Sequence, residues 1–548
     1  MYKPSILALS TLLFVGSVDL RSQTPDPIAE MQTQAVATNT SSWGHWGPNP
    51  EKYSSWTTHT NRLIPAYIFG GDFSRVAGEK SIYRCTVAIE KLYGFLPEET
   101  ANPHAEYFDQ TDIFRLQKWA VESGKKRIIL FVFDGMDWHT SRAAAINKTA
   151  AVKYDSGRGE GLWFQDYRGA RTDFGYFVSS PHDEGTSANV DKQILTSPGK
   201  ILGGYSAALC GPTPWGPITD AKYPNSTSDK VKHAYTDSAS SATSMCSGIK
   251  TYNDAINVDV KGREVLPIAR TLQEQGFAIG VVTSVPISHA TPACAYATNV
   301  HRDDYQDLTR DMIGRPSVFH PGGLTGVDGL IGGGFGVTKD KDGQQGGNFV
   351  AGNRYLTADD FAAVDAKNGG KYVVAQRTMG KAGPQVLEAA AHAAIVQRKR
   401  LLGYFGAAGG HLPFRTADGR FDPVVSVGNE ETAKAEKYTA EDLSENVTLS
   451  DMSLAAVRVL QARSDKWWLM VEAGDVDWAN HSNNIDNSIG AVLSGDAAFK
   501  QLTKWIENNG GWDDTLAIVT ADHGHYLVLN HPEALTVQPI SLPSSPSP

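Results

Sequence analysis

Four short apolar runs, each of a length typical of a buried strand, constrain the fold of this chain more than any other feature. They are Arg127–Phe133, Phe277–Thr283, Trp467–Val471 and Thr515–Thr520. Continuous apolar runs of this kind are typical of parallel strands that are covered on both faces. Stretches with helical periodicity lie between them, at 264–274, 385–397 and 449–462. The alternation predicts an α/β fold, with a doubly wound, mostly parallel central sheet and helices on both faces.

Changes in composition divide the 548 residues into five expected segments. Lys3 and the mostly apolar stretch Ile6–Val18 are typical of a secretory signal peptide, expected over 1–19, and the stretch is shorter than the roughly 20 residues that a membrane-spanning helix needs. An uncleaved N-terminal anchor is the alternative. We expect a flexible lead-in at 20–50, an N-terminal elaboration at 51–125, the main domain at 126–537 and a disordered, Pro- and Ser-rich tail at 538–548.

The charge balance and the cysteines narrow the class of protein further. A net charge of -10 and a pI of about 5.8 argue against nucleic-acid binding, because an acidic surface repels polyanions. Apart from the expected signal, no segment is long and apolar enough to span a membrane, so a secreted or periplasmic protein is expected. The four cysteines contain no Cys-x-x-Cys pair, and two disulfides among them could form in three ways.

Acidic and histidine side chains follow the predicted strands. Asp134 comes directly after the first run, Glu472 after the third, and Asp522 and His523 after the fourth. Open α/β sheets place their sites beyond the carboxyl ends of the strands, so we expect these side chains to converge. Carboxylates mixed with imidazoles suit zinc and magnesium. The structural alternative for Asp522 is a helix N-cap.

Asp477 and His481 extend this pattern, because residues four apart lie on one face of a helix and can share a cation. The alternative is an ordinary Asp–His pair on a helix surface. The Gly-rich stretch 322–347 is expected to be a flexible loop or insertion. It is not a phosphate cradle, since no Gly-Lys-Ser/Thr sequence follows it.

The block around Asp237 and Ser238 supplies a candidate nucleophile. Ser238 would begin a helix of small residues, where backbone N–H groups favour an alkoxide or a phosphate ester. The alternative is that either residue is only an N-cap. Downstream, His289 and Thr291 offer an imidazole and a hydroxyl ligand, and Arg302 offers the planar fork that binds two phosphate oxygens. For Arg302 the alternative is a surface ion pair.

Together, and in this order, these motifs resemble the alkaline phosphatase family. They are the Asp after the first strand, the Asp-Ser-Ala-x-Ser-Ala-Thr block, His-Ala-Thr-Pro-Ala with an Arg thirteen residues beyond its His, Glu-x4-Asp-x3-His, and Thr-Ala-Asp-His. The resemblance implies hydrolysis of small phosphate monoesters through a phosphoserine, with two Zn²⁺ and one Mg²⁺, in a homodimer. The implied nucleophile is Ser238 and the implied phosphoryl clamp is Arg302, oriented by Asp237. The implied ligands are Asp134, Asp522 and His523 for the zinc that activates Ser238, Asp477 and His481 for the second zinc, and Asp134, Thr291 and Glu472 for magnesium.

The sequence departs from the family pattern at two places. The family supplies a further histidine to the second zinc, and here only His525 and His531 follow His523. His525 is expected to lie too close to His523 to reach the other ion, which leaves His531 as a candidate if its loop folds back. A chain shortened at its C-terminal end would explain the missing ligand. His289 and Trp478 stand where some members have Asp and Lys, so the identity of the third metal stays open.

Two other functions remain open at the level of sequence. A phosphodiesterase of the same superfamily would share the metal core, and a catalytically impaired metal- or phosphate-binding homologue would fit the incomplete second zinc site. A sulfatase is disfavoured, because the Cys/Ser-x-Pro-x-Arg context is absent around Ser238.

Overall fold

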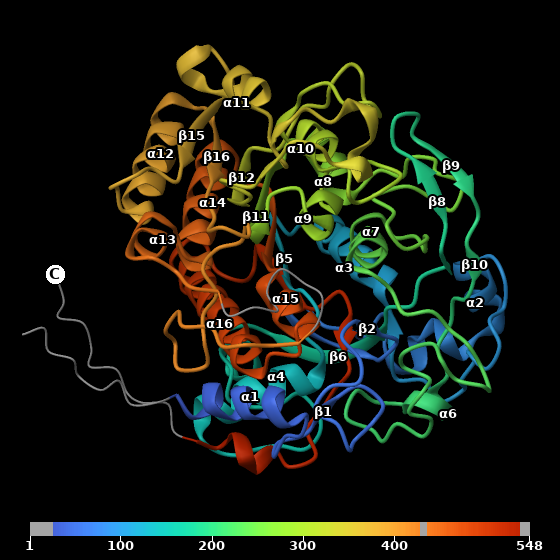
Figure 1. The fold of residues 1–548 in the computed structure, drawn as a ribbon. Coiled ribbons are helices and arrows are strands. Elements are labelled where there is room, and N and C mark those ends of the chain that lie inside the picture. Colours follow the sequence, from blue (N-terminus) through green and yellow to red (C-terminus); the bar gives the residue numbers. More distant parts are fainter. Residues whose placement is uncertain (1–25, 428–435, 538–548) are drawn as a thin grey trace, which may run out of the picture.

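A ten-stranded sheet forms the centre of the molecule (Figure 1). The computed structural model describes residues 26–427 and 436–537. The strand order is β15 (Tyr372–Gln376), β16 (Arg400–Tyr404), β12 (Gly329–Gly333), β11 (Ala278–Pro286), β17 (Trp467–Ala473), β5 (Arg127–Phe133), β18 (Thr515–Thr520), β3 (Ile64–Phe69), β6 (Thr172–Val178) and β4 (Phe108–Asp109). All neighbours from β15 to β18 are parallel, whereas β3 is antiparallel to both β18 and β6. The predicted mostly parallel α/β fold is confirmed.

Helices cover the sheet on both sides (Figure 1). One side carries α4 (Trp138–Thr149), α12 (Gly383–Gln397), α14 (Leu449–Arg463) and α16 (Ile485–Asn508), and the other carries α3 (Gln110–Glu122), α7 (Ser238–Ser247), α8 (Ile268–Glu274) and α9 (Ala290–Cys294). The buried strands and the inner faces of these helices share one large hydrophobic core. Burial on both faces explains why β5, β17 and β18 are apolar throughout.

Shorter elements complete the described chain. The helices are α1 (Pro27–Thr38), α2 (Thr86–Tyr93), α5 (Trp163–Asp166), α6 (Ala207–Cys210), α10 (Tyr305–Ile313), α11 (Ala358–Val364), α13 (Ala440–Glu445) and α15 (Asp475–His481). Two-stranded ladders join β1 (His45–Trp46) to β20 (Leu527–Val528), β2 (His59–Thr60) to β19 (Gly524–His525), β7 (Asp183–Glu184) to β10 (Lys200–Ile201), β8 (Ser187–Asn189) to β9 (Ile194–Ser197), and β13 (Thr338–Lys339) to β14 (Gly352–Asn353). Within the described residues, none of the helices combines the length and the hydropathy that crossing a membrane requires.

The N-terminal part of the chain differs from its expected organisation. The expected lead-in at 20–50 contains α1 and β1 from residue 27 onward, and Trp43 and Trp46 are fully buried. The expected elaboration at 51–125 contributes β3 to the central sheet, so the main domain begins before residue 126. Aromatic side chains anchor these segments although the composition around them is polar. The predicted signal peptide at 1–19 and the tail at 538–548 lie outside the described residues.

The Gly-rich stretch 322–347 is a strand in part, where a loop was expected. It contains β12, which lies between β11 and β16. A Cβ atom on Gly332 would lie 2.6 Å from Thr283 Cγ2, and one on Gly333 would lie 2.2 Å from the Gly410 carbonyl oxygen. Glycine therefore permits close packing at these two positions. The glycines that suggested a loop are required for this strand to pack against its neighbours.

Candidate metal and nucleophile site

The candidate site lies at the carboxyl ends of three neighbouring strands, β17, β5 and β18. Register pairs Val132 of β5 with both Glu472 of β17 and Thr520 of β18. Asp134 and Asp522 each follow their strand by one or two residues, so the three carboxylates emerge side by side. Adjacent parallel strands thus bring together segments that are up to 388 residues apart in the chain (522 - 134).

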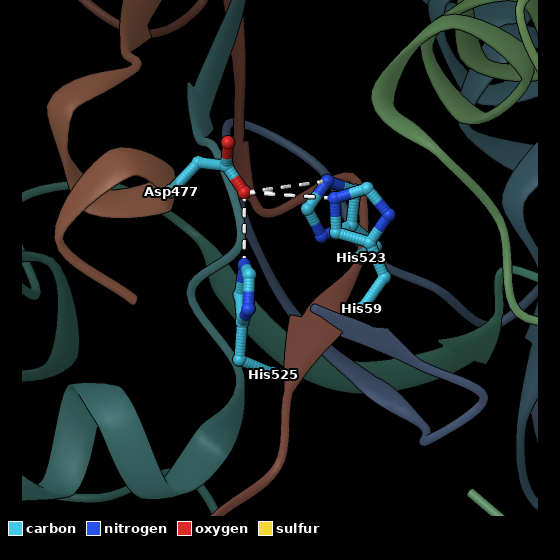
Figure 2. Close-up of side chains that lie close together, drawn as sticks. All are labelled: His59, Asp477, His523 and His525. Carbon is cyan, nitrogen blue, oxygen red and sulfur yellow. Dashed lines mark hydrogen bonds and ion pairs between the residues drawn. The ribbon is translucent and has the colours of Figure 1, made fainter. Parts of the chain in front are cut away.

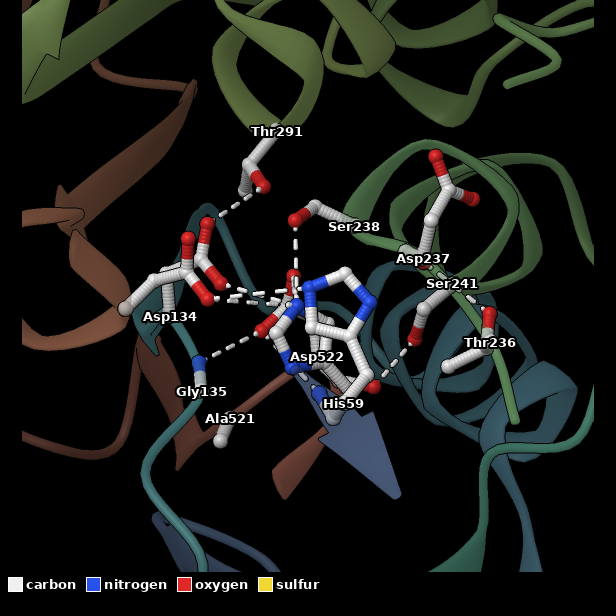
Figure 3. Close-up of polar contacts among 12 residues, drawn as sticks. His59, Asp134, Gly135, Thr236, Asp237, Ser238, Ser241, Thr291, Ala521 and Asp522 are labelled. Atoms are coloured by element: carbon white, nitrogen blue, oxygen red, sulfur yellow. Dashed lines mark hydrogen bonds and ion pairs between the residues drawn. The ribbon is translucent and has the colours of Figure 1, made fainter. Parts of the chain in front are cut away.

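Asp134, Asp522 and His523 form a buried group next to Ser238. Figure 3 shows Asp134 and Asp522 together with Ser238. Ser238 Oγ lies 3.0 Å from His523 Nε2. The same nitrogen lies 3.2 Å from Asp134 Oδ1 and 3.5 Å from Asp522 Oδ2. The backbone N–H of Gly135 donates to Asp522 Oδ1 at 3.0 Å and fixes that carboxylate.

A second buried group consists of His59, Asp477, His523 and His525, whose potential ligand atoms all lie within 4.8 Å of one another (Figure 2). Asp477 Oδ1 lies 2.8 Å from His525 Nε2, 3.8 Å from His59 Nε2 and 3.8 Å from His523 Nε2. His481 lies on the same helix as Asp477, α15. Its Nε2 is 3.4 Å from Asp477 Oδ1 and 3.0 Å from His59 Nε2. The predicted pair Asp477–His481 therefore meets three more histidines.

Two expectations about the second group are wrong. His525 was expected to be too close to His523, but the chain is extended here, and side chains two apart on an extended segment point to the same side. His531 has a side chain that is 69% exposed and pairs with Glu533. His59 is a further member of this group that was not predicted from the sequence, and β2 places it opposite His525 in the β19 ladder. The His-x-His pattern was an available signal for His525, whereas no local signal marked His59.

Direct contacts join only some of the predicted magnesium ligands, which are Asp134, Thr291 and Glu472. Thr291 Oγ1 donates to Asp134 Oδ2 at 3.4 Å, and Glu472 accepts a hydrogen bond from Thr283 of β11. Glu472 Oε1 accepts no hydrogen bond from any described residue. His289 caps α9 at the wall of the adjoining cavity, and its buried Nδ1 has no hydrogen-bond partner among the described residues.

Helix α7 positions both the nucleophile candidate and the arginine. Asp237 is its N-cap and accepts from the Ser240 backbone N–H at 2.9 Å. The other Asp237 oxygen accepts from Arg302 Nη1 at 2.8 Å. Asp237 is therefore an N-cap, which was the alternative to a role in the site, and its second oxygen also orients Arg302. Ser238 and Arg302 line one cavity of about 510 Å³ together with Asp477 and His481.

The electrostatics of the site favour the binding of cations. Burial raises the pKa of Glu472 to about 8, and burial followed by the nearby carboxylates raises the pKa values of Asp134 and Asp522 well above their usual range. Burial also lowers the pKa of His59 and holds its imidazole neutral, the form that binds metals. Burial of Asp477 acts against its ionisation, but the surrounding histidines outweigh it and hold its pKa well below the usual range.

The donor set fits zinc and magnesium. Asp134 Oδ1, Asp522 Oδ2 and Glu472 Oε1 are buried oxygens that accept no hydrogen bond from any described residue. Buried polar atoms are rarely left unpaired, and a cluster of such oxygens beside imidazole nitrogens suits divalent cations. The four-residue group around Asp477 matches a site rich in imidazole, whereas Asp134, Thr291 and Glu472 offer only oxygens.

Gly135 permits the two groups to approach each other. Its φ is +70°, and a Cβ there would lie 2.8 Å from His525 Nε2 and 3.1 Å from Asp477 Oδ1. Its carbonyl accepts from Asn480 Nδ2 at 2.9 Å, which ties the turn after β5 to α15. Any side chain at this position would push into the ligands, so glycine is required on both conformational and steric grounds.

The chain is similar in sequence to several alkaline phosphatases. Alkaline phosphatase 4 of Bacillus subtilis is 28% identical over 295 residues, which cover 54% of this chain and 50% of that protein. The Escherichia coli K12 alkaline phosphatase is 27% identical over 300 residues, covering 53% and 58%. The chain thus spans about half the length of the curated relatives it matches. A crystal structure of the Thermus thermophilus alkaline phosphatase matches 73% of this chain and 60% of that one, with a TM-score of 0.44 and 21% identity.

A family model also matches the chain. The model described as alkaline phosphatase matches residues 219–541, which is more than half of the chain. This range includes the nucleophile block, the Arg302 segment, the Asp477 helix and the Asp522–His523 pair. Asp134 and His59 lie upstream of the match and join the site through the sheet and the β2–β19 ladder. This chain belongs to the alkaline phosphatase family.

Proposed function

We propose that this protein hydrolyses phosphate monoesters, with Ser238 as the nucleophile. The observation that carries the proposal is the position of Ser238 Oγ, 3.0 Å from the one imidazole nitrogen that belongs to both metal-ligand groups. A hydroxyl at that position, at the first residue of a helix, is suited to attack a phosphorus atom bound at the helix N-terminus.

The reaction would proceed in two displacements. Ser238 Oγ, after losing its proton to solvent, attacks phosphorus as the bond between phosphorus and the ester oxygen breaks, which gives a phosphoserine. The leaving alkoxide takes up a proton from solvent and departs as the alcohol. Water then attacks the phosphoserine, releases inorganic phosphate and restores Ser238. Arg302 would bind two phosphoryl oxygens throughout, and its ion pair with Asp237 keeps the fork oriented toward Ser238.

The residues present would hold three cations. Asp134, Asp522 and His523 would hold one zinc. Asp477 with His525, His59 and His481 would provide the second zinc site. Asp134, Thr291 and Glu472 would bind magnesium. When bound, such ions lower the pKa of a nearby hydroxyl and stabilise the attacking and leaving oxygens of an in-line displacement.

The test is hydrolysis of 4-nitrophenyl phosphate by the purified chain with added zinc and magnesium. Ser238→Ala should lower kcat by at least about a thousandfold, because the nucleophile is lost. Ser244→Ala is the matched control, since this serine lies on the same helix and its hydroxyl donates to the Ser240 carbonyl of that helix. Equal activity of Ser238→Ala and Ser244→Ala would remove Ser238 from the mechanism.

The same assay separates the alternatives. A phosphodiesterase would hydrolyse bis(4-nitrophenyl) phosphate faster than the monoester. A catalytically impaired homologue would bind zinc and hydrolyse neither ester. Preference for the monoester by tenfold or more in kcat/KM is the expected result.

Location and assembly are also part of the proposal. The expected signal at 1–19 supports export to the periplasm or the medium, and the family resemblance supports a homodimer. Cell fractionation and sedimentation of the purified chain test these two statements. Retention in the cytoplasm, or a monomer at micromolar concentration, would contradict them.

A further inference from the structure

Arg354 lines the same cavity as Ser238 and Arg302 but has no part in the proposed mechanism. It follows β14, in the connection between β12 and α11. The cavity volume of about 510 Å³ is within the range of sites that hold whole small molecules, and it is far larger than a phosphoryl group. There is room for the alcohol portion of an ester beside Arg354.

The Arg354 guanidinium is held in one orientation from two sides. Its Nε donates to Asp342 Oδ2 at 2.9 Å. Its planar group lies 4.8 Å from the ring centre of Tyr305 and 5.8 Å from that of Tyr355, both within the range of cation–π attraction. The two rings are buried, so the fork is fixed before any ligand arrives.

The outer edge of this fork is not used by the protein. Neither Nη nitrogen of Arg354 has a hydrogen-bond partner among the described residues, although the side chain is only 18% exposed. Arg302, by comparison, directs Nη1 to Asp237. A mostly buried arginine with both terminal nitrogens open to a cavity is suited to bind a planar or multi-oxygen anion.

The segment that carries Arg354 is attached to the helix that follows Arg302. Gln345 Nε2 donates to Asp342 Oδ2 and to the Arg354 carbonyl, each at 3.1 Å. Gln345 Oε1 in turn accepts from the backbone N–H of Gln306 at 2.9 Å, near the start of α10. Helix α10 begins three residues after Arg302, so the two arginines are held at a set separation.

The acidic residues that line the cavity leave the terminal nitrogens of Arg354 available to a ligand. Asp254 and Asp303 line the same cavity, and both raise the pKa of Arg302 by their charge. Asp303 Oδ1 also accepts from the Tyr305 hydroxyl at 2.7 Å. Within the part of the chain that the structure describes, Asp342 is the one carboxylate that bonds to Arg354, and it does so through Nε.

We propose that Arg354, backed by Tyr305 and Tyr355, binds a second anionic group on the alcohol portion of the substrate. The preferred esters would then be phosphate monoesters whose alcohol also carries a carboxylate or another phosphate. This inference rests on the proposed function, because it assigns the leaving-group side of the same site. The anion would accept from the two Nη groups, and its carbon frame would lie against the tyrosine rings.

The test compares phenyl phosphate with 4-carboxyphenyl phosphate in the metal-loaded enzyme. Arg354→Gln should lower the ratio of the two kcat/KM values, carboxylated over plain, by about ten- to a hundredfold, the range expected for loss of a charged hydrogen bond. Arg354→Lys keeps the charge without the fork and should give an intermediate ratio. The control is Lys339→Gln, which removes an exposed positive charge from β13 of the same connection and should leave the ratio within twofold of wild type.

A binding measurement keeps this inference separable from the proposed reaction. Calorimetry with phenylphosphonate and 4-carboxyphenylphosphonate requires no turnover, and Arg354→Gln should weaken only the carboxylated compound by a similar factor. Equal weakening of both compounds, or of neither, overturns the subsite even if both esters are hydrolysed. Conversely, Arg354-dependent binding without hydrolysis of either ester would remove the proposed function and keep the subsite. Unchanged thermal midpoints of the variants would show that they fold.

Discussion

The side chains of His59, Asp477, His523 and His525 lie together and are fully or almost fully buried. Apolar packing does not account for three imidazoles and a carboxylate at one place in the interior. Burial of ionisable groups is unfavourable unless a partner offsets it. The histidines hold the pKa of Asp477 down, and burial lowers the pKa values of His59 and His525, the latter to about 3. At neutral pH the imidazoles of His59 and His525 are therefore neutral beside an ionised carboxylate.

The first prediction separates the two histidines that follow His523. His525→Ala should weaken zinc binding by about ten- to a hundredfold, since a residue that contacts Asp477 directly is removed. His531→Ala should leave zinc content unchanged, because its side chain is exposed and pairs with Glu533. Zinc titration against a coloured chelator measures both. Loss of zinc from His531→Ala, and not from His525→Ala, would reverse the assignment.

The second prediction concerns Gly135. Gly135→Ala should lower the free energy of unfolding by about 2–4 kcal/mol, from left-handed strain together with the collision at His525. Gly94→Ala is the matched control, since its φ is +78° but nothing lies within 4 Å of the added Cβ, so only about 1 kcal/mol of strain is expected. Urea unfolding measures the two changes. Equal losses in both variants would show that the contact with His525 does not matter.

At the scale of secondary-structure elements, a polar bridge through His320 joins α10 to the segment that precedes α8. His320 lies in the connection between α10 and β12 and joins two elements. Its Nδ1 lies 2.9 Å from Asp311 on α10, and its Nε2 lies 2.9 Å from Glu264, which precedes α8. These two carboxylates outweigh the effect of burial and raise the pKa of His320 to about 9.

The third prediction follows from that shift. Because the folded-state pKa of His320 is above its value of 6.5 in the unfolded chain, its contribution is full below about pH 6.5 and is lost as pH rises through about 9. His320→Gln should therefore lower the free energy of unfolding by about 1–3 kcal/mol at pH 6 and by much less at pH 10. Urea unfolding of both proteins across this range tests it. A difference that grows with pH would contradict the sign.

At the scale of the whole molecule, the candidate site connects segments that span most of the described chain. Its side chains come from the β2 ladder, the ends of β5 and β18, and helices α7, α9 and α15. Bound cations would therefore link the N-terminal, central and C-terminal parts of one hydrophobic core. Metal binding that requires the folded arrangement adds directly to stability.

The fourth prediction is that chelation destabilises the whole protein. Removing metal with excess chelator should lower the thermal midpoint, and an ion present at a thousand times its dissociation constant contributes about 4 kcal/mol. Ser238→Ala should show nearly the same shift, because most ligands remain, which separates stability from activity. Calorimetric scans with and without chelator measure this. Identical midpoints would mean that the metals do not link the segments.

The local pattern of the sequence was enough to predict the central strands and the helix that begins at Ser238. The bounds of β5 and β18 agree with the predicted runs, and α7 begins at Ser238 as expected. These features depend on the residues next to each other: continuous apolar runs, a cap and small helical residues. Strand β12 was not predicted, because a run of glycines is also typical of a loop. Here close packing against β11 requires the glycines.

The sequence by itself determined the fold class, the family resemblance and the residues at the strand ends. Each of these depends on short motifs whose residues are neighbours in the chain. Tertiary structure alone decided that His59 and His525 meet Asp477, and that Arg354 lines the same cavity as Ser238. These groupings bring together residues that are 466 and 116 positions apart in the chain (525 - 59 and 354 - 238). Such pairings depend on the register of ladders and on packing between elements, and no local pattern of side chains specifies either.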